Sequence, residues 1–573
     1  MIEYPVENYT FENKFICSLM NRQRRMSLTM KKHLLISFLL ICFFSAQAQI
    51  REKDELKLKG LSAITEDAVK GQLEFLASDW TEGRETGTKG SFMAADYIAS
   101  MLKVYGIVPI GDYERPGPKQ NVITNPLKRT FFQDFSLIES QQGDSQQFSV
   151  SFTDGTGIRK IDLNYRTDFY CGTTEAGIDL SAPVVFIGYG IIDESKGINE
   201  LKGLNVKGKI VLRLVGTPGM NFPNSEGMKK FGTEIVLKDE LLLKNGALAI
   251  MDVATDDDLQ SWAENYPFHF KSAFYEGDSM PEFLKSKRMR IPLDTLSTNL
   301  KRILISKRVA NEILRESGIT VDGYATDASG LKFPRLKNLT GINAHIAMSV
   351  KNRVVKARNI IGIIEGEIKD EYVVVGGHYD HVGIQNGLIF NGADDNASGT
   401  VGIMTLAKAF MATGVKPKRT ILFALWTGEE KGLLGSDYFV ENSAFKDKKI
   451  VFYLNYDMIS RSAPEDTIGK TVKIVYPKSY PAFEEITKNN MKANDIDLTP
   501  NFVPMDIPRG GSDYTAFCLK NVPLMAWNAG HPAEYHKPND EVSLVNWAKM
   551  INIIKLGFLD VWDITNGNIL REK

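Results

Sequence analysis

Residues 372–399 read YVVVGGHYDHVGIQNGLIFNGADDNASG, and this stretch sets the fold that the rest of the chain completes. Its first part, Tyr372–Val375, is a short apolar run that two glycines end, which is typical of a buried strand. Residues 397–412 then show the apolar spacing of a helix. Histidine and aspartate residues stand where the predicted strand ends, so polar chemistry is expected at that end of the strand.

The same alternation of strands and helices continues towards the end of the chain. The further predicted elements are strand Ile421–Leu425, helix 433–442, strand Ile450–Leu454, strand Leu524–Trp527 and a final helix from about 543. Alternation of this kind predicts an α/β fold with a mixed, mostly parallel sheet flanked by helices. Residues 62–107 are also predicted to be helical, and Gly83, Gly87 and Gly90 divide them into two helices.

Composition excludes several classes of protein. The 573 residues contain 69 Lys and Arg against 70 Asp and Glu, so no basic surface for nucleic acid is expected. Four cysteines in a chain of this length exclude a scaffold stapled by disulfides. Two of them, Cys171 and Cys518, lie in what are predicted to be different domains, and we expect both to remain thiols.

The start of the chain has the pattern of a secretory signal peptide. Two lysines at 31–32 precede the 11-residue apolar run Leu34–Phe44, and Ala46-Gln47-Ala48 forms a cleavage site with small residues. A spanning helix needs about 20 apolar residues, so this run is too short to be one. We therefore expect a mature chain that starts at Gln49, is exported to the periplasm or the medium, and has no contact with the membrane.

Histidines and carboxylates concentrate in six segments of the last third of the chain. These segments are His378-Tyr379-Asp380-His381, Asp394-Asp395-Asn396, Glu429-Glu430, Asp457, Ser512-Asp513-Tyr514 and Tyr535-His536. Each alone has an ordinary explanation: the Asp-Asp-Asn segment suits a helix cap, and a Glu pair is usually solvated. Several of them directly follow predicted strands, where ligands bind in open α/β sheets. Two imidazoles and three or four carboxylates are enough to hold two divalent ions, so a metal site is predicted.

The strings GGHYDHVG, FNGADDNASGT, WTGEEKGLLGS, NYDM, GGSDY and EYHKPND resemble the co-catalytic zinc aminopeptidase family. Its relatives include glutamate carboxypeptidases and glutaminyl cyclases, and the chain looks most like exported bacterial members that carry a protease-associated domain. The resemblance implies the zinc exopeptidase fold with an inserted β-rich domain that covers the cleft and admits short peptides. Ser512-Asp513-Tyr514 departs from the Ser-Asp-His of many relatives, which leaves substrate contacts open but not metal binding.

The resemblance also implies a role for each of eight residues and two Zn²⁺ ions per chain. Asp394 would bridge the two ions, with Glu430 and His536 completing one site and His378 and Asp457 completing the other. Glu429 would be the general base, and Asp380 would orient His378. Tyr535 would polarise the scissile carbonyl. The family's cis bond would be Asp394–Asp395. For His381, lining the pocket and simple packing are equally good interpretations.

These observations together predict how the chain is divided and what it does. Residues 1–48 are upstream residues and signal peptide, 49–145 the N-terminal part of the catalytic domain, 146–345 an insert containing the protease-associated domain, and 346–573 the main part of the catalytic domain. We expect an exported metalloexopeptidase that acts on peptides, most simply an aminopeptidase. A carboxypeptidase or glutaminyl cyclase of the same family and a non-catalytic binding protein are the alternatives, and the sequence indicates neither the preferred residue nor the oligomeric state.

Overall fold

The computed structural model describes residues 55–567 except 117–125, 166, 172–176, 194–196, 217, 219–238, 255–286, 293–300, 386, 443–444, 446–447 and 509. The predicted signal peptide lies outside these residues. Among the helices that are described, none is both long enough and apolar enough to pass through a bilayer. The described cysteines, Cys171 and Cys518, are both buried, and no disulfide joins them.

One sheet runs through the molecule, and one half of it carries the predicted metal site. In spatial order this half contains β19 (Thr499–Met505), β18 (Thr471–Pro477), β20 (Leu524–Asn528), β17 (Lys449–Tyr456), β13 (Ile368–His378), β16 (Arg419–Trp426) and β12 (Ile342–Ile364). The central strands β20, β17, β13 and β16 are parallel to their neighbours, whereas β12 and β18 pair antiparallel. The predicted mixed, mostly parallel sheet is confirmed.

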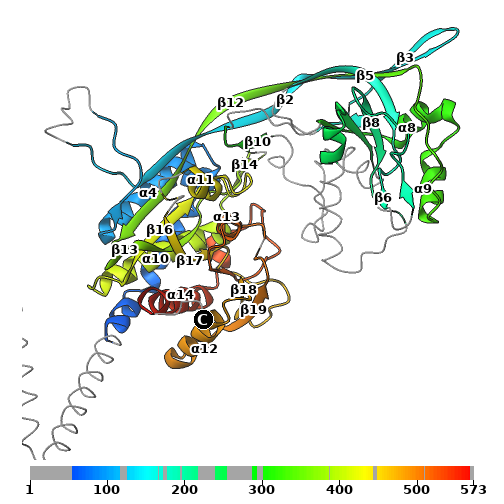
Figure 1. The fold of residues 1–573 in the computed structure, drawn as a ribbon. Helices are drawn as coiled ribbons and strands as arrows, with labels where there is room; N and C mark the ends of the chain where they lie inside the picture. The colour runs from blue at the N-terminus through cyan, green and yellow to red at the C-terminus, as the bar shows by residue number, and fades with distance from the viewer. Residues whose placement is uncertain are drawn as a thin grey trace, which may run out of the picture.

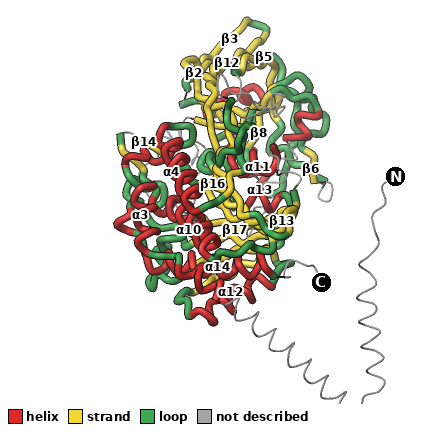
Figure 2. The backbone as a smooth tube through the Cα atoms, turned by 90° about the vertical axis from the view of Figure 1, so that its left-hand side faces the viewer, coloured by secondary structure: helices red, strands yellow, loops and turns green. Residues whose placement is uncertain are grey.

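Helices cover both faces of this half, because its strands are apolar on both sides. In β13, Val373 and Val375 belong to one hydrophobic core and Val374 to the other. The first core lies under α3 (Glu66–Leu76), α4 (Lys89–Tyr105), α10 (Gly399–Ala412) and α14 (Trp547–Asn566), and the second under α11 (Leu434–Asn442) and α13 (Tyr514–Leu519). Figure 2 shows α4, α10 and α14 together on one side of β16 and β17.

The predicted helices of this half are present, with small differences at their ends. Residues 62–107 form α3 and α4 as two separate helices, and the second ends at Gly106 in the left-handed conformation that glycine favours. The final helix starts at Trp547 and not near 543, because Val542–Leu544 forms a separate single turn. Strands β18 and β19, with α12 (Ala482–Asn494) between them, were not predicted.

Two unusually long strands connect this half of the sheet to the other. β2 (Phe132–Asp154) and β12 each contain 23 residues, and they pair antiparallel from Phe132 opposite Ile360 to Phe152 opposite Ile342. Figure 1 shows them as a ribbon between the two bodies of the molecule. The predicted boundaries at 145/146 and 345/346 therefore fall inside β2 and β12, so the sheet is continuous across them.

The insert has a hydrophobic core of its own around a second set of parallel strands. This set is β5 (Ile178–Phe186), β8 (Ile210–Leu214), β9 (Ala249–Val253) and β11 (Lys301–Ile305), with α8 (Lys307–Leu314) and α9 (Val321–Ser329) packed beside it. The insert is thus β-rich, as predicted, but it also contains helices that pack on its sheet.

Candidate metal centre

Neighbouring parallel strands bring the predicted site residues to one edge of the sheet. His378 is the last residue of β13, Asp457 directly follows β17, and the pair Glu429–Glu430 lies just after β16. Asp395 lies in the turn that leads into α10, and His536 lies in the loop between β20 and α14. Because carboxyl ends of parallel strands meet at one edge, residues far apart in the sequence become neighbours.

The side chains at this edge form two groups of possible metal ligands. The first group contains His381, Asp395, Glu430 and His536, and the second contains His378, Glu429 and Asp457. In each group, one ligand atom per residue lies within 4.8 Å of the corresponding atoms of the others. Imidazole nitrogens and carboxylate oxygens in this number and spacing fit divalent transition metals such as zinc.

Asp395 links the two groups, since its two carboxylate oxygens face in different directions. Oδ2 lies 2.9 Å from His536 Nε2, and Oδ1 lies 3.5 Å from His378 Nε2. His536 Nε2 also lies 3.1 Å from Glu430 Oε2, and His378 Nε2 lies 3.5 Å from Asp457 Oδ1. A carboxylate placed in this way fits the bridging position between two ions.

The structure does not place Asp394, the expected bridging residue, in either group. Its Oδ1 instead accepts hydrogen bonds from the backbone N–H of Ser460 at 2.8 Å, the Ser460 hydroxyl at 2.7 Å and the Arg461 N–H at 3.1 Å. The cis peptide bond is also one residue further along, at Asp395–Asn396. The expected position of Asp394 is therefore wrong: Asp395 has the geometry that suits a bridging carboxylate, whereas the Asp394 carboxylate binds the neighbouring 460–461 loop.

Asp380 contacts His378 by a different atom from the one expected. His378 Nδ1 lies 3.2 Å from the Asp380 backbone carbonyl and 3.8 Å from its carboxylate. The carboxylate accepts instead from the Glu429 N–H at 3.3 Å and from the Thr86 hydroxyl at 2.7 Å. The backbone of Asp380 orients the imidazole, and its side chain fixes the loop that carries the two glutamates.

The adjacent glutamates have opposite electrostatic environments. Burial raises the pKa of Glu429 well above its usual value, and the nearby Glu430 and Asp457 add to this although His378 opposes it. Burial acts in the same direction on Glu430, but His536 and His381 together hold its pKa well below the usual value. Glu430 is therefore the stable anion and Glu429 the carboxyl that takes up a proton readily, a division typical of sites with acid–base chemistry.

The centre as a whole requires positive charge. Burial lowers the pKa of His536, yet Glu430 and Asp395 raise it to about 10, so these carboxylates hold a proton on the ring. Buried like charges destabilise one another unless a cation or a proton lies between them. A bound cation would replace that proton, so the donor set and its charge both fit a metal ion.

Tyr535 lies against the same cluster. Its ring stacks on His536 with a centroid distance of 3.9 Å. Burial raises the pKa of the phenol well above its usual value, and Asp395, Glu430 and Glu429 raise it further. Tyr535 is therefore a neutral hydrogen-bond donor beside the predicted site.

Two residues outside the expected set of site residues hold the site together. Arg84 is fully buried, and its guanidinium donates to the carbonyls of Tyr379 at 2.8 Å, Asn391 at 2.7 Å and Gly392 at 2.9 Å. Asp540 accepts from the backbone N–H of Asp395, at 3.1 Å, on the other side of the same turn. A single arginine in a predicted helical region carries no functional signal.

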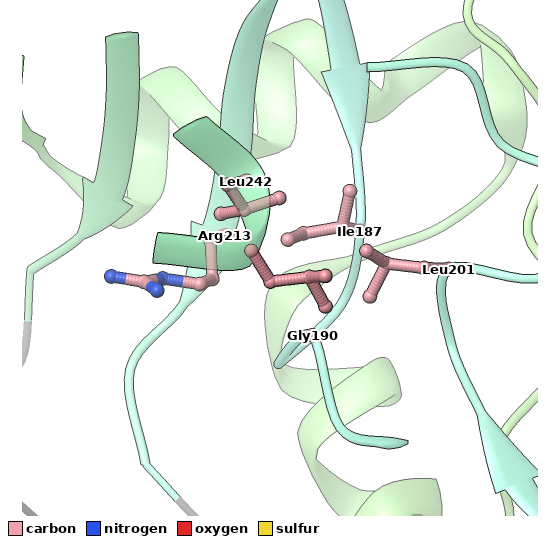
Figure 3. A pocket seen from close by; sticks show the side chains of 6 residues that line it. Ile187, Gly190, Leu201, Arg213 and Leu242 are labelled. Atoms are coloured by element: carbon pink, nitrogen blue, oxygen red, sulfur yellow. The ribbon is translucent and has the colours of Figure 1, made fainter. Parts of the chain in front are cut away.

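The described part of the insert has no comparable site. No group of three or more His, Cys, Asp and Glu ligands occurs among its described residues. It has a small hollow lined mainly by aliphatic side chains, among them Ile187, Leu201 and Leu242 (Figure 3). The Arg213 guanidinium points away from this hollow and binds Asp252 at 2.8 Å, so no polar groups converge there.

Comparison with known proteins agrees with the fold and the site. The class defined by both is an α/β protein with paired metal-ligand groups at strand ends. Residues 359–557 match the model of Peptidase family M28. The matched residues contain nearly all of the candidate metal centre, and the resemblance to co-catalytic zinc aminopeptidases is confirmed.

Individual relatives match over longer stretches of this chain, at about 30% identity. The chain is 28% identical over 398 residues to a glutamate carboxypeptidase 2 homolog of Caenorhabditis briggsae, covering 61% of this chain and 48% of the relative. It is 31% identical over 235 residues to leucine aminopeptidase 2 of Trichophyton equinum, covering 39% and 45%. The chain thus spans about half the length of these relatives. An aminopeptidase structure from Aneurinibacillus sp. strain AM-1 aligns with a TM-score of 0.52 at 16% identity, covering 90% of this chain and 98% of that one, which confirms the fold.

The assignment of Asp395 predicts different outcomes for two adjacent substitutions. Asp395→Asn removes the charge shared by both ligand groups, so zinc affinity should fall by more than roughly 100-fold. Asp394→Asn weakens the bonds to the 460–461 loop, so it should reduce the free energy of unfolding by about 1–3 kcal/mol and thereby lower the melting temperature. It should leave the zinc content unchanged. Metal analysis after dialysis and thermal unfolding measure the two effects. Loss of zinc in Asp394→Asn but not in Asp395→Asn would reverse the assignment.

Proposed function

We propose that this chain is a two-zinc aminopeptidase that releases N-terminal residues from peptides. The observation that carries the proposal is the position of Asp395 between two histidine-containing groups, with Glu429 at the edge of one of them. His378, Asp395 and Asp457 would hold one ion, and Asp395, Glu430 and His536 the other. When bound, zinc ions would supply Lewis acidity, which lowers the pKa of the attacking water.

Glu429 is the residue to move the proton. Its buried carboxyl has a raised pKa, so it accepts a proton from the attacking water more readily than Glu430 does. The oxygen of that water forms a bond to the peptide carbonyl carbon, and Glu429 then passes the proton to the departing amine. The backbone bond from the Glu429 N–H to Asp380 keeps the carboxyl in place during both transfers.

Tyr535 is suited to stabilise the negative charge that develops on the carbonyl oxygen. Its phenol stays protonated in this anionic surrounding, and its ring is held by stacking on His536. A preorganised donor of this kind acts on the transition state more than on the substrate. Substituting it with Phe removes only the donor.

The charge around the centre favours a substrate ammonium over a substrate carboxylate. Among the described residues beside it, Arg461 donates to Glu534 at 2.5 Å, and Lys431 lies 3.0 Å from Glu85. Both cations contact acids of the protein, whereas a carboxypeptidase needs a cation that receives the substrate's terminal carboxylate; Arg461 Nη1, which has no hydrogen-bond partner among the described residues, is the group that the substrate panel below tests for that role. Arg509, which the sequence places beside Gly510 and Gly511 and which is a candidate for this role, lies outside the described residues.

Relatives with different activities define the alternatives. The names of two relatives, a glutamate carboxypeptidase 2 homolog and a leucine aminopeptidase 2, represent two exopeptidase classes. A glutaminyl cyclase would use the same fold, and a binding protein would use it without turnover. We further propose that the enzyme acts outside the cytoplasm, on the basis of the signal peptide pattern around Leu34–Phe44.

Removing the proposed base separates chemistry from metal binding. Glu429→Gln keeps the shape of the side chain but cannot accept a proton, so turnover of aminoacyl anilides should fall by roughly 10²–10⁴-fold. Glu367→Gln, an exposed position in the same domain, serves as the matched control and should leave turnover unchanged. Zinc content, measured on both proteins, should stay at the wild-type level. Wild-type turnover in Glu429→Gln would exclude it as the base.

A substrate panel distinguishes the enzyme classes. Zinc-loaded protein should release the first residue from peptides and aminoacyl anilides, and should leave a dipeptide with a blocked amine and an N-terminal glutaminyl peptide unchanged. Chelation should abolish the release, and added zinc should restore it, because the side-chain ligands bind the ions reversibly and a chelator competes for them. Cleavage of the blocked dipeptide identifies a carboxypeptidase, and ammonia release from the glutaminyl peptide identifies a cyclase.

A further inference from the structure

His381 is a third histidine at the centre, and the proposed function gives it no role. It follows His378 by three residues, beyond the end of β13, and it is fully buried. Its backbone N–H donates to the Arg84 carbonyl at 3.3 Å, which holds this segment against the N-terminal part of the chain. His381 lies beside the carboxylates of Glu430 and Asp395, and the surroundings of its two ring nitrogens show which one carries the hydrogen.

The two nitrogens of His381 have very different surroundings. Nδ1 lies 2.9 Å from Glu430 Oε1 and 3.7 Å from Asp395 Oδ2. Nε2 is buried and has no hydrogen-bond partner among the described residues. His378 shows the opposite arrangement: its Nδ1 faces a backbone carbonyl, and its Nε2 faces the carboxylates.

This difference decides between a metal ligand and a hydrogen-bond donor. If His381 bound an ion through Nδ1, the neutral ring would carry its hydrogen on Nε2, where no acceptor is available. Ligating histidines almost always donate their other N–H, and a buried donor without an acceptor costs about 1–3 kcal/mol. With the hydrogen on Nδ1, the ring donates to Glu430 and leaves only an acceptor unpaired. The 2.9 Å distance is that of a hydrogen bond.

We propose that His381 is a positioning residue that donates its Nδ1–H to Glu430 Oε1 and so directs this carboxylate towards the metal. The inference rests on the proposed function, since it assumes that Glu430 is a ligand. His381 Nδ1 lies 2.9 Å from Oε1, and both carboxylate oxygens lie 3.1 Å from His536 Nε2, so the bond holds the carboxylate with both oxygens facing the second histidine. A carboxylate fixed in this way loses less freedom when an ion binds, so the ion binds more tightly.

A pair of amide substitutions tests the position of the donor. The side-chain N–H of His381→Asn lies where Nδ1–H lies, whereas that of His381→Gln lies near Nε2. Both variants are neutral and polar, so they serve as matched controls for each other. Removing an outer hydrogen-bond partner costs about 10–100-fold in metal affinity. In His381→Gln, zinc binding at one of the two sites should therefore weaken by about 10–100-fold, and in His381→Asn by about threefold at most.

Zinc affinity is measured on the full-length proteins by competition with a chelator, and circular dichroism checks that both variants are folded. A second measurement repeats His381→Gln in a Glu430→Ala background, where the effect on zinc should disappear because the acceptor is gone. Equal weakening in the Asn and Gln variants, or no weakening in either, would overturn the inference and leave the proposed function intact. Wild-type protein that binds no zinc would overturn both.

Discussion

The centre depends on the mutual repulsion of buried carboxylates. Asp395, Glu429, Glu430 and Asp457 meet at one edge of the sheet, where Asp395 is buried and the other three are partly buried. Such groups cannot all be ionised unless positive charge lies between them. Their surroundings meet this requirement in part, since Glu430 is held as an anion while Glu429 takes up a proton. Two cations would satisfy the rest, and the same repulsion then contributes to their affinity.

The fold resists this repulsion with bonds that lie just behind the ligands. Arg84 has a pKa that burial lowers to about 10, so it remains a cation at neutral pH, and it ties the two ligand loops together through their carbonyls. Asn396 donates to the carbonyls of His378 and Tyr456 and accepts from the Gly399 N–H. The Arg84 guanidinium therefore holds the backbone before Asp395, and the fully hydrogen-bonded Asn396 side chain holds the backbone after it. These bonds fix the position from which the Asp395 carboxylate projects.

Patterns of strands and helices predict this half of the fold well, because its strands are apolar runs that end in histidines and carboxylates rather than in ordinary turns. The same pattern places His378, Glu430, Asp457 and His536 at one edge. It does not distinguish Asp394 from Asp395, because both follow the same strand and the choice depends on which carboxylate the 460–461 loop binds. The ribbon of β2 and β12 was also missed, since its pairing joins residues about 200 positions apart.

The most direct test of the account is the position of the ions in a crystal of zinc-loaded protein. An anomalous difference map recorded at the zinc edge locates them without reference to the side chains. The account predicts two peaks, one among His378, Asp395 and Asp457 and the other among Asp395, Glu430 and His536. A single peak that does not contact Asp395, or ions bound only outside this cluster, would contradict it.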